Sequence, residues 1–215
     1  MFIGHFALGL AAKRATPRLS LALLFAAAQL ADLLWPLLVA IGLEQVRIDP
    51  GNTAVTPLDF VSYPYSHSLA LLILWAGLFA WVFAPSHSRR AFAVLALLVV
   101  SHWVLDYVTH RPDMPLYPGG PKLGLGLWNS RAATVAVEVP MYLAGLWFYF
   151  SATRPRDGVG RWAFGLLAAT LLIIYAGNLM GPPPPSVSAL WQVAIGGSIL
   201  ILFWSWWADR HRDVR

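Results

Sequence analysis

Long apolar runs are the feature of this sequence that most restricts how the chain can fold. A helix needs about 20 mostly apolar residues to cross roughly 30 Å of hydrocarbon. Six stretches approach or reach this length, over about residues 19 to 43, 67 to 84, 91 to 108, 132 to 153, 161 to 180 and 187 to 208. Because lipid cannot hydrogen-bond the backbone, the sequence predicts an all-α, polytopic membrane helix bundle with about six transmembrane helices.

The composition agrees with this fold class. Of 215 residues, 58% are hydrophobic and only 12% are charged. The mean hydropathy of +0.62 is too high for a soluble domain of this size. A shorter apolar piece, residues 2 to 12, ends at Lys13 and Arg14 and cannot cross alone. We expect it to form a half-inserted N-terminal helix, whose free end must be covered by protein or line a cavity.

Basic residues are distributed unevenly between the loops. Most of the 15 Lys and Arg residues lie near the N-terminus, around Arg89 and Arg90, between residues 154 and 161, and in the C-terminal tail. By the positive-inside rule these segments face the cytoplasm. We therefore expect a multi-pass protein of a bacterial-type inner (plasma) membrane, with both termini cytoplasmic and with the loops 44 to 66 and 109 to 131 facing outward.

The chain contains no Cys, so any bound metal must be held by nitrogen and oxygen donors. Ionisable side chains inside apolar spans are costly, and each one is a functional candidate. At ~1.5 Å of rise per helical residue, the candidates are expected at a common depth, in the upper middle or outer half of the membrane. They are His5, Asp32, His67, His102, Asp106, His110 and Glu138. Imidazoles and carboxylates gathered at one depth predict a metal site.

His102, Asp106 and His110 carry the strongest of these signals. They recur at every fourth residue, so they lie along one helical face. Neutral imidazole and carboxylate at this spacing can ligate one ion or bridge two. A polar stripe along a water channel, or three hydrogen-bonded core residues, would give the same pattern. We favour the metal site because the other candidates share its depth.

Three of the other candidates have their own structural alternatives. Asp32 could be a structural carboxylate bonded to a neighbouring hydroxyl, and His67 could cap a helix or meet a lipid headgroup. Glu138 could instead pair with Arg131 or Arg111. The sequence leaves these alternatives open.

The outward loop 109 to 131 also carries side chains suited to phosphate oxygens. They are Arg111, Lys122, Asn129 and Arg131. Snorkelling of a basic side chain to the interface would explain each cation alone. Together these residues predict a substrate-binding clamp over the metal site. The site then belongs to a transmembrane bundle of residues 1 to 153, and residues 154 to 215 are expected to add two accessory helices and a cytoplasmic tail.

Several short motifs occur in a fixed order along the first two thirds of the chain. They are Gly4-His5-Phe6, Ala31-Asp32-Leu33, Tyr65-Ser66-His67-Ser68, Ser101-His102-Trp103-Val104-Leu105-Asp106, His110-Arg111-Pro112-Asp113 and Gly124-Leu125-Gly126-Leu127-Trp128-Asn129-Ser130. In this combination the chain resembles the membrane-bound metal-dependent hydrolases, also called LexA-binding inner-membrane-associated hydrolases. The resemblance covers roughly residues 1 to 145.

That family is thought to be distantly similar to zinc-dependent phospholipase C and to the zinc single-strand nucleases. The resemblance implies that the metal ligands are, in order, His5, Asp32, His67, His102, Asp106, His110 and Glu138, with Asp106 bridging. The soluble enzymes carry a further His four residues before the final Glu, where this chain has Thr134. They also use a processed N-terminal residue as a ligand. The resemblance therefore implies one or two divalent ions, with zinc as the expected metal.

The resemblance also implies phosphoester hydrolysis. A site within the bilayer favours a membrane lipid headgroup at the outer leaflet over nucleic acid. Asp32 is expected as ligand or general base, and Arg111 as a catalytic contact to the phosphate. A zinc amidase acting on a lipid amide would use the same ion. A non-enzymatic cation or proton transporter is the alternative from another class, but the cytoplasmic third of every predicted span lacks the ionisable residues that a path would need.

Overall fold

The computed structural model describes residues 1–86 and 88–215, and this part of the chain is mostly helical. Its nine α-helices are α1 (Ile3–Ala15), α2 (Leu21–Ala28), α3 (Leu30–Ala40), α4 (Pro64–His67), α5 (Leu69–Phe83), α6 (Arg89–Thr109), α7 (Arg131–Ala152), α8 (Gly158–Met180) and α9 (Val187–Arg210). Short strands pair antiparallel, β1 (Gln45–Ile48) with β2 (Leu58–Ser62), β3 (Met114–Pro115) with β4 (Lys122–Leu123), and β5 (Thr153–Pro155) with β6 (Arg212–Val214). A short 3-10 turn, η1 (Leu127–Asn129), precedes α7.

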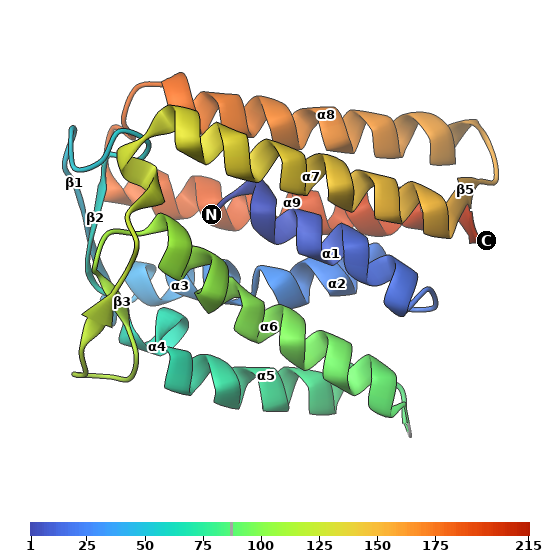
Figure 1. The fold of residues 1–215 in the computed structure, drawn as a ribbon, viewed down its shortest axis with the longest axis horizontal. Coiled ribbons are helices and arrows are strands. Elements are labelled where there is room, and N and C mark those ends of the chain that lie inside the picture. The colour runs from blue at the N-terminus through green and yellow to red at the C-terminus, as the bar shows by residue number, and fades with distance from the viewer. Residues whose placement is uncertain (87) are drawn as a thin grey trace.

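The long helices lie side by side, with α1 in the middle of the bundle (Figure 1). Strands β1, β2 and β3 lie together at one end of the bundle, which we name the strand end. Strand β5 and the C-terminus lie at the opposite end, which we name the basic end because most Lys and Arg residues of the sequence belong to its connections. The charge asymmetry predicted from the loops is therefore an asymmetry between the two ends of one bundle.

Four helices, α6 to α9, are long and apolar enough to cross a membrane, and α2 with α3 makes a fifth span if this bent pair is counted as one. These findings account for five of the six predicted spans among the described residues. The remaining span, residues 67 to 84, supplies α5, which has 15 residues. At ~1.5 Å per residue, α5 reaches only about 22 Å and is shorter than the hydrocarbon core.

The predicted span of residues 19 to 43 is not one straight helix. It breaks at Gln29, and α2 and α3 meet at an angle of 61°. At the break the carbonyl of Ala28 accepts a hydrogen bond from Nδ1 of His102 at 2.8 Å. A helix interrupted inside a bundle is tolerated where other groups satisfy the freed backbone. The bend therefore joins the first apolar segment to α6 beside His102.

Helix α1 is buried between α7 and α2 and forms where the sequence predicted the short N-terminal helix. Gly145 allows the close approach of α7, because a Cβ there would lie 2.6 Å from the carbonyl oxygen of Ala7. At the basic end, Nζ of Lys13 donates to the buried Asp209 carboxylate at 2.6 Å. This pair fixes α1 along the bundle axis. The chain start lies inside the bundle (Figure 1), and Met1 is buried. The cytoplasmic location of both termini stays a prediction.

The last two helices pack directly on the first ones. Helix α9 contacts α2, α3 and α8, and α8 contacts α1. The C-terminal strand β6 pairs with β5, so the tail is bound to the end of α7. The division of the chain at residue 154 stays a prediction.

The orientation of the bundle can be tested with single cysteines, because the chain has none of its own. Leu125 is exposed at the strand end, and Arg156 is exposed at the basic end. We expect Leu125→Cys to react with a membrane-impermeant thiol reagent in intact cells, and Arg156→Cys to react only after lysis. The opposite pattern would reverse the topology and place the strand end in the cytoplasm.

Candidate metal centre

Helix α6 supplies the first donors of the candidate metal centre. Nε2 of His102 lies 3.1 Å from Oδ2 of Asp106, one turn further along the same face. His110 follows α6 directly, because Arg111 precedes Pro112 and a residue before proline disfavours the helical conformation. Its Nε2 lies 3.9 Å from the same Asp106 oxygen. The predicted stripe thus converges on one buried carboxylate.

Helix α1 brings His5 to the other oxygen of this carboxylate. Nε2 of His5 lies 3.0 Å from Oδ1 of Asp106. The imidazoles of His5 and His102 stack with centroids 3.8 Å apart and planes 3° from parallel. The α-amino group of Met1 also donates to Oδ1 of Asp106, and it lies 3.2 Å from Oγ1 of Thr109. Each Asp106 oxygen therefore has its own set of partners.

Asp32 on α3 and His67 on α4 complete the cluster. Nε2 of His67 lies 3.5 Å from Oδ1 of Asp32, and Nε2 of His102 lies 3.8 Å from the same oxygen. Two groups of donors could each hold an ion, with all their atoms within 4.8 Å of one another. The first is His5, His102 and Asp106, and the second is Asp32, His67 and His102. One imidazole nitrogen binds one ion, so His102 can serve only one of the two groups at a time.

Glu138 contacts the start of α1 through one oxygen of its carboxylate, and its predicted role as a metal ligand stays a prediction. Its Oε2 accepts from the backbone N–H groups of Phe2 at 2.9 Å and Gly4 at 3.3 Å. A carboxylate here accepts hydrogen bonds from the free N–H groups at the start of α1. Its negative charge is also stabilised by the positive end of the helix dipole. The two groups of metal-holding donors found among the described residues include neither Glu138 nor His110. Glu138 also lines the same cavity as Asp106.

The donor atoms have the separations that a metal would require. Zinc–nitrogen bonds of about 2.0–2.1 Å place tetrahedral ligand atoms roughly 3.4 Å apart. The separations around His102 and His67 run from 3.1 to 3.9 Å. Nε2 of His102 is buried and, within the described part of the chain, forms no aligned hydrogen bond. Burying such an atom costs free energy, and a cation at its lone pair would offset that cost.

In both His102 and His110, Nδ1 is the ring nitrogen that points away from the cluster, and it donates a hydrogen bond. Nδ1 of His102 donates to the Ala28 carbonyl at 2.8 Å, and Nδ1 of His110 donates to Asp113 at 2.9 Å. In the neutral imidazole this leaves a lone pair on Nε2, which faces the cluster. Such outer partners orient metal-ligating histidines and fix their tautomer. The hydroxyl of Tyr63 also donates to Asp113 at 2.8 Å, and burial raises the pKa of this phenol, which keeps it a neutral donor.

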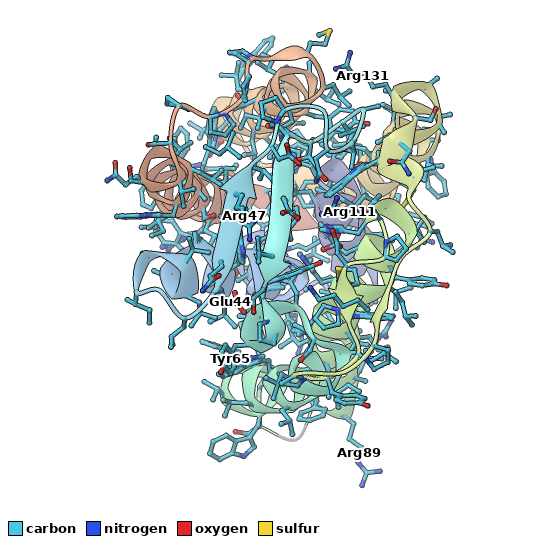
Figure 2. The ribbon with its side chains drawn as sticks, turned by 90° about the vertical axis from the view of Figure 1, so that its left-hand side faces the viewer. Glu44, Arg47, Tyr65, Arg89, Arg111 and Arg131 are labelled. Carbon is cyan, nitrogen blue, oxygen red and sulfur yellow. The ribbon has the colours of Figure 1, made fainter. Side chains whose placement is uncertain are left out.

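His67 is oriented through a relay of two residues. The Ser66 hydroxyl donates to Oε2 of Glu44 at 2.6 Å and accepts from Nδ1 of His67 at 2.7 Å. The other Glu44 oxygen accepts from the backbone N–H groups of Tyr65 and Ser66 at the start of α4. One buried carboxylate thus caps α4 and fixes the imidazole that α4 presents. Figure 2 shows Glu44 close to Tyr65 at the strand end.

Ser66 and Asp113 belong to the sequence motifs, but nothing in those motifs indicates that they orient His67 and His110. Glu44 was missed altogether. It lies in the chain between α3 and β1, and its link to His67 depends on tertiary packing. An acidic residue in a loop between a helix and a strand gives no signal of this contact in the sequence.

The cluster opens into a cavity of about 650 Å³. Asp32, His67, Asp106, His110 and Glu138 line one part of it, and the loop between β1 and β2 lines another. The cavity continues along residues of α8 and α9. The site is therefore connected to a space large enough for a ligand of the usual pocket size.

The predicted phosphate clamp is only partly assembled. Arg111 donates to Asn52 and Asp59, and its Nε lies 3.3 Å from Asp113. Lys122 donates to the carbonyl of Val61 at 3.0 Å, and neither Arg111 nor Lys122 is among the residues lining the cavity.

Asn129 is exposed and also lies outside the cavity lining. Arg131 lines the cavity and donates to the carbonyl of Ala54 at 2.6 Å. Figure 2 shows Arg111 beside the strand pair and Arg131 further along the same end. Of the four predicted clamp residues, Arg131 is the one that lines this cavity, and the clamp stays a prediction.

No protein-family model, curated protein or solved structure matches the chain. The comparisons therefore add no family to the motif resemblance. The fold and the cluster rest on the geometry described above, which includes candidate membrane helices and buried His and Asp groups that could hold a metal.

Replacing His102 with Ala removes the donor that both groups share. We expect the purified variant to retain at least about tenfold less zinc per mole of protein than the wild type, as measured by elemental analysis. His211→Ala is the matched control, because His211 lies at the basic end, bonded to Asp157 at 2.7 Å. Full zinc content in a His102→Ala protein that elutes like the wild type would contradict the assignment.

Proposed function

We propose that this protein is an integral membrane metal-dependent hydrolase that acts on a lipid. The observation that carries the proposal is the convergence of four imidazoles and two carboxylates, from α1, α3, α4, α6 and the residue after α6, on one point of an apolar bundle. Ionisable groups are retained inside a membrane protein where they serve a site or a path. The motif resemblance supports the same class, and the chain would then be a member of the membrane-bound metal-dependent hydrolases.

The residues fit one or two zinc ions. His102 and Asp106 would hold an ion together with His5, and Asp32 and His67 would hold the alternative or second one. His110 faces the second oxygen of Asp106, which suits that carboxylate to a bridging role. A bound zinc would lower the pKa of a water molecule toward ~7 and polarise the bond to be cleaved.

Asp32 is the residue best suited to handle the proton of the attacking water. Its side chain is 43% exposed, whereas that of Asp106 is 3% exposed. Asp32 also lines the cavity, where a substrate would lie. A carboxylate that is open to the substrate and held near two imidazoles can accept a proton and pass it on. We assign Asp32 as general base or as the exchangeable ligand.

The proposed bond is a phosphoester of a lipid headgroup, cleaved at the outer leaflet. Two observations support it. The order of the donors along the chain resembles that of the zinc phospholipases, except that Thr134 replaces one His. Arg131 offers a guanidinium to the cavity for charge-assisted hydrogen bonds to phosphate oxygens. Arg111 becomes a positioning residue in this account, because it binds Asp113, which in turn orients His110.

The pairing of Arg111 favours a second candidate, a zinc amidase acting on a lipid amide. An amide carries no charge and needs no cationic clamp, and both Arg111 and Lys122 are occupied by protein partners. The two candidates share the metal, the general base and the membrane substrate. They differ in the bond that is cleaved, and identification of the reaction products distinguishes them.

A transporter is the weaker alternative. Beyond His5, the buried residues of α1 towards Lys13 are the apolar Phe6, Ala7, Gly9 and Leu10. Lys13 itself is neutralised by Asp209 at 2.6 Å. An ion would need polar groups between these two sites, and this part of the helix supplies a hydrophobic core instead.

The phosphoester proposal can be tested by comparing Asp32→Asn with Arg131→Gln in zinc-loaded protein. Loss of a general base should lower kcat by about 10²–10⁴-fold. Loss of the charge-assisted bond should raise KM by roughly tenfold and leave the metal in place. Arg90→Gln, at the basic end, is the control for loss of a cation. Substrates are a phospholipid and a lipid amide in the same detergent micelles, with products identified by mass spectrometry.

Headgroup release from the phospholipid, with the expected kcat and KM effects, supports the proposal. Fatty-acid release from the amide alone would assign the amidase. No product from either substrate at full zinc occupancy would overturn the hydrolase.

A further inference from the structure

The cavity beside the cluster of candidate metal ligands has two chemically different parts. One part is charged and carries Asp32, His67, Asp106, His110, Arg131 and Glu138. The other part is formed by α8 and α9, and among the described residues these helices bring no charged side chain to it. Its lining is mainly aliphatic, with Ile174, Leu179, Leu190, Val193, Ile201 and Leu202. A ligand that fills the whole cavity must be charged or polar at one end and apolar at the other.

Helix α9 presents a continuous face to this space. The cavity-lining positions of α9 are residues 190, 193, 194, 197, 198, 201 and 202. This spacing of three and four residues is one stripe of an α-helix. Small residues widen the groove where they occur, with Gly177 and Gly181 from α8 and its end, and Ala194 and Gly197 from α9. We name this part of the cavity the α8–α9 groove.

Three buried polar atoms along the same cavity make no hydrogen bond within the described part of the chain. They are Oε1 of Gln29, Nε1 of Trp35 and the hydroxyl oxygen of Tyr175. The three residues are only 6%, 7% and 5% exposed. Buried polar groups in proteins are nearly always partnered. Nε1 of Trp35 donates, Oε1 of Gln29 accepts and the Tyr175 hydroxyl can do either, so they fit a ligand with ester and hydroxyl oxygens better than a plain hydrocarbon.

We propose that the α8–α9 groove binds an acyl chain of the lipid whose headgroup meets the metal cluster, and that it sets the preference for chain length. Gln29, Trp35 and Tyr175 then bind the polar region between headgroup and chain. This proposal rests on the proposed function, because it takes the same lipid as substrate. It gives α8 and α9, which supply none of the donors in the cluster, a direct part in substrate selection.

Two neighbouring glycines of α9 provide the test and its control. A Cβ built on Gly197 or on Gly196 meets no heavy atom within 4 Å, so either position accepts a side chain without a backbone clash. Gly197 lines the cavity, whereas Gly196 is exposed on the outside of the bundle. Gly197→Phe should fill the groove, and Gly196→Phe should add the same ring to the lipid-facing surface.

The probe is a long-chain phospholipid with a photoreactive diazirine at the end of its acyl chain, added to zinc-loaded protein in micelles. We expect crosslinks in α8 and α9 in the wild type and in Gly196→Phe. In Gly197→Phe they should fall by about tenfold or more, since loss of a few buried methylene contacts reaches that factor. Hydrolysis of a long-chain lipid should fall with them, while hydrolysis of a short-chain lipid is retained.

The crosslinking does not depend on turnover, so the two proposals can fail separately. If crosslinks are lost only in Gly197→Phe and the wild type hydrolyses neither lipid, the groove proposal is supported and the hydrolase proposal is overturned. Equal crosslinking in Gly196→Phe and Gly197→Phe, or crosslinks confined to helices other than α8 and α9, would overturn the groove. That result would leave the hydrolase standing if the wild type still releases product.

Discussion

The buried carboxylate of Asp106 is the group around which the rest of the structure is organised. An ionised carboxylate inside an apolar bundle is costly unless cations or hydrogen-bond donors surround it. The neutral rings of His102 and His110 turn lone pairs to Asp106, so a metal ion bound between them would offset this cost. Helix α1 brings His5 and the Met1 amino group to one oxygen, and His102, His67 and His110 face the other. The short helix α1, the bend between α2 and α3, and the four-residue helix α4 all place donors around this one group.

The groups that hydrogen-bond the imidazoles from outside the cluster lie in the irregular parts of the bundle. The broken helix frees the Ala28 carbonyl for His102, and the strand end holds Glu44 and Asp113 behind His67 and His110. These contacts leave the inner nitrogens directed at the cluster. Regular helices alone would satisfy their own backbones and could not supply such acceptors. The departures from a simple helix bundle therefore occur where the site requires them.

Features with a local cause could be predicted from the sequence. The helix period put His102 and Asp106 on one face, and the length of residues 2 to 12 predicted a helix that enters the bundle without crossing it. Features that depend on tertiary contacts were missed. The bend at Gln29 has no Pro or Gly beside it, and Arg111 looked available to substrate because its partners Asn52 and Asp59 lie in a different loop. Glu138 was predicted as a ligand from its chemistry alone, and its hydrogen bond to the backbone at the start of α1 could not be predicted from the sequence.

The converging imidazoles and carboxylates are proposed to bind a transition metal. X-ray absorption at the zinc edge of purified, zinc-loaded protein tests this proposal most directly, because it reports the atoms bonded to the ion. The account predicts a shell of nitrogen and oxygen donors at about 2.0–2.1 Å with the outer scattering of several imidazoles. An oxygen shell without imidazole scattering, or a protein that retains no stoichiometric metal, would contradict it.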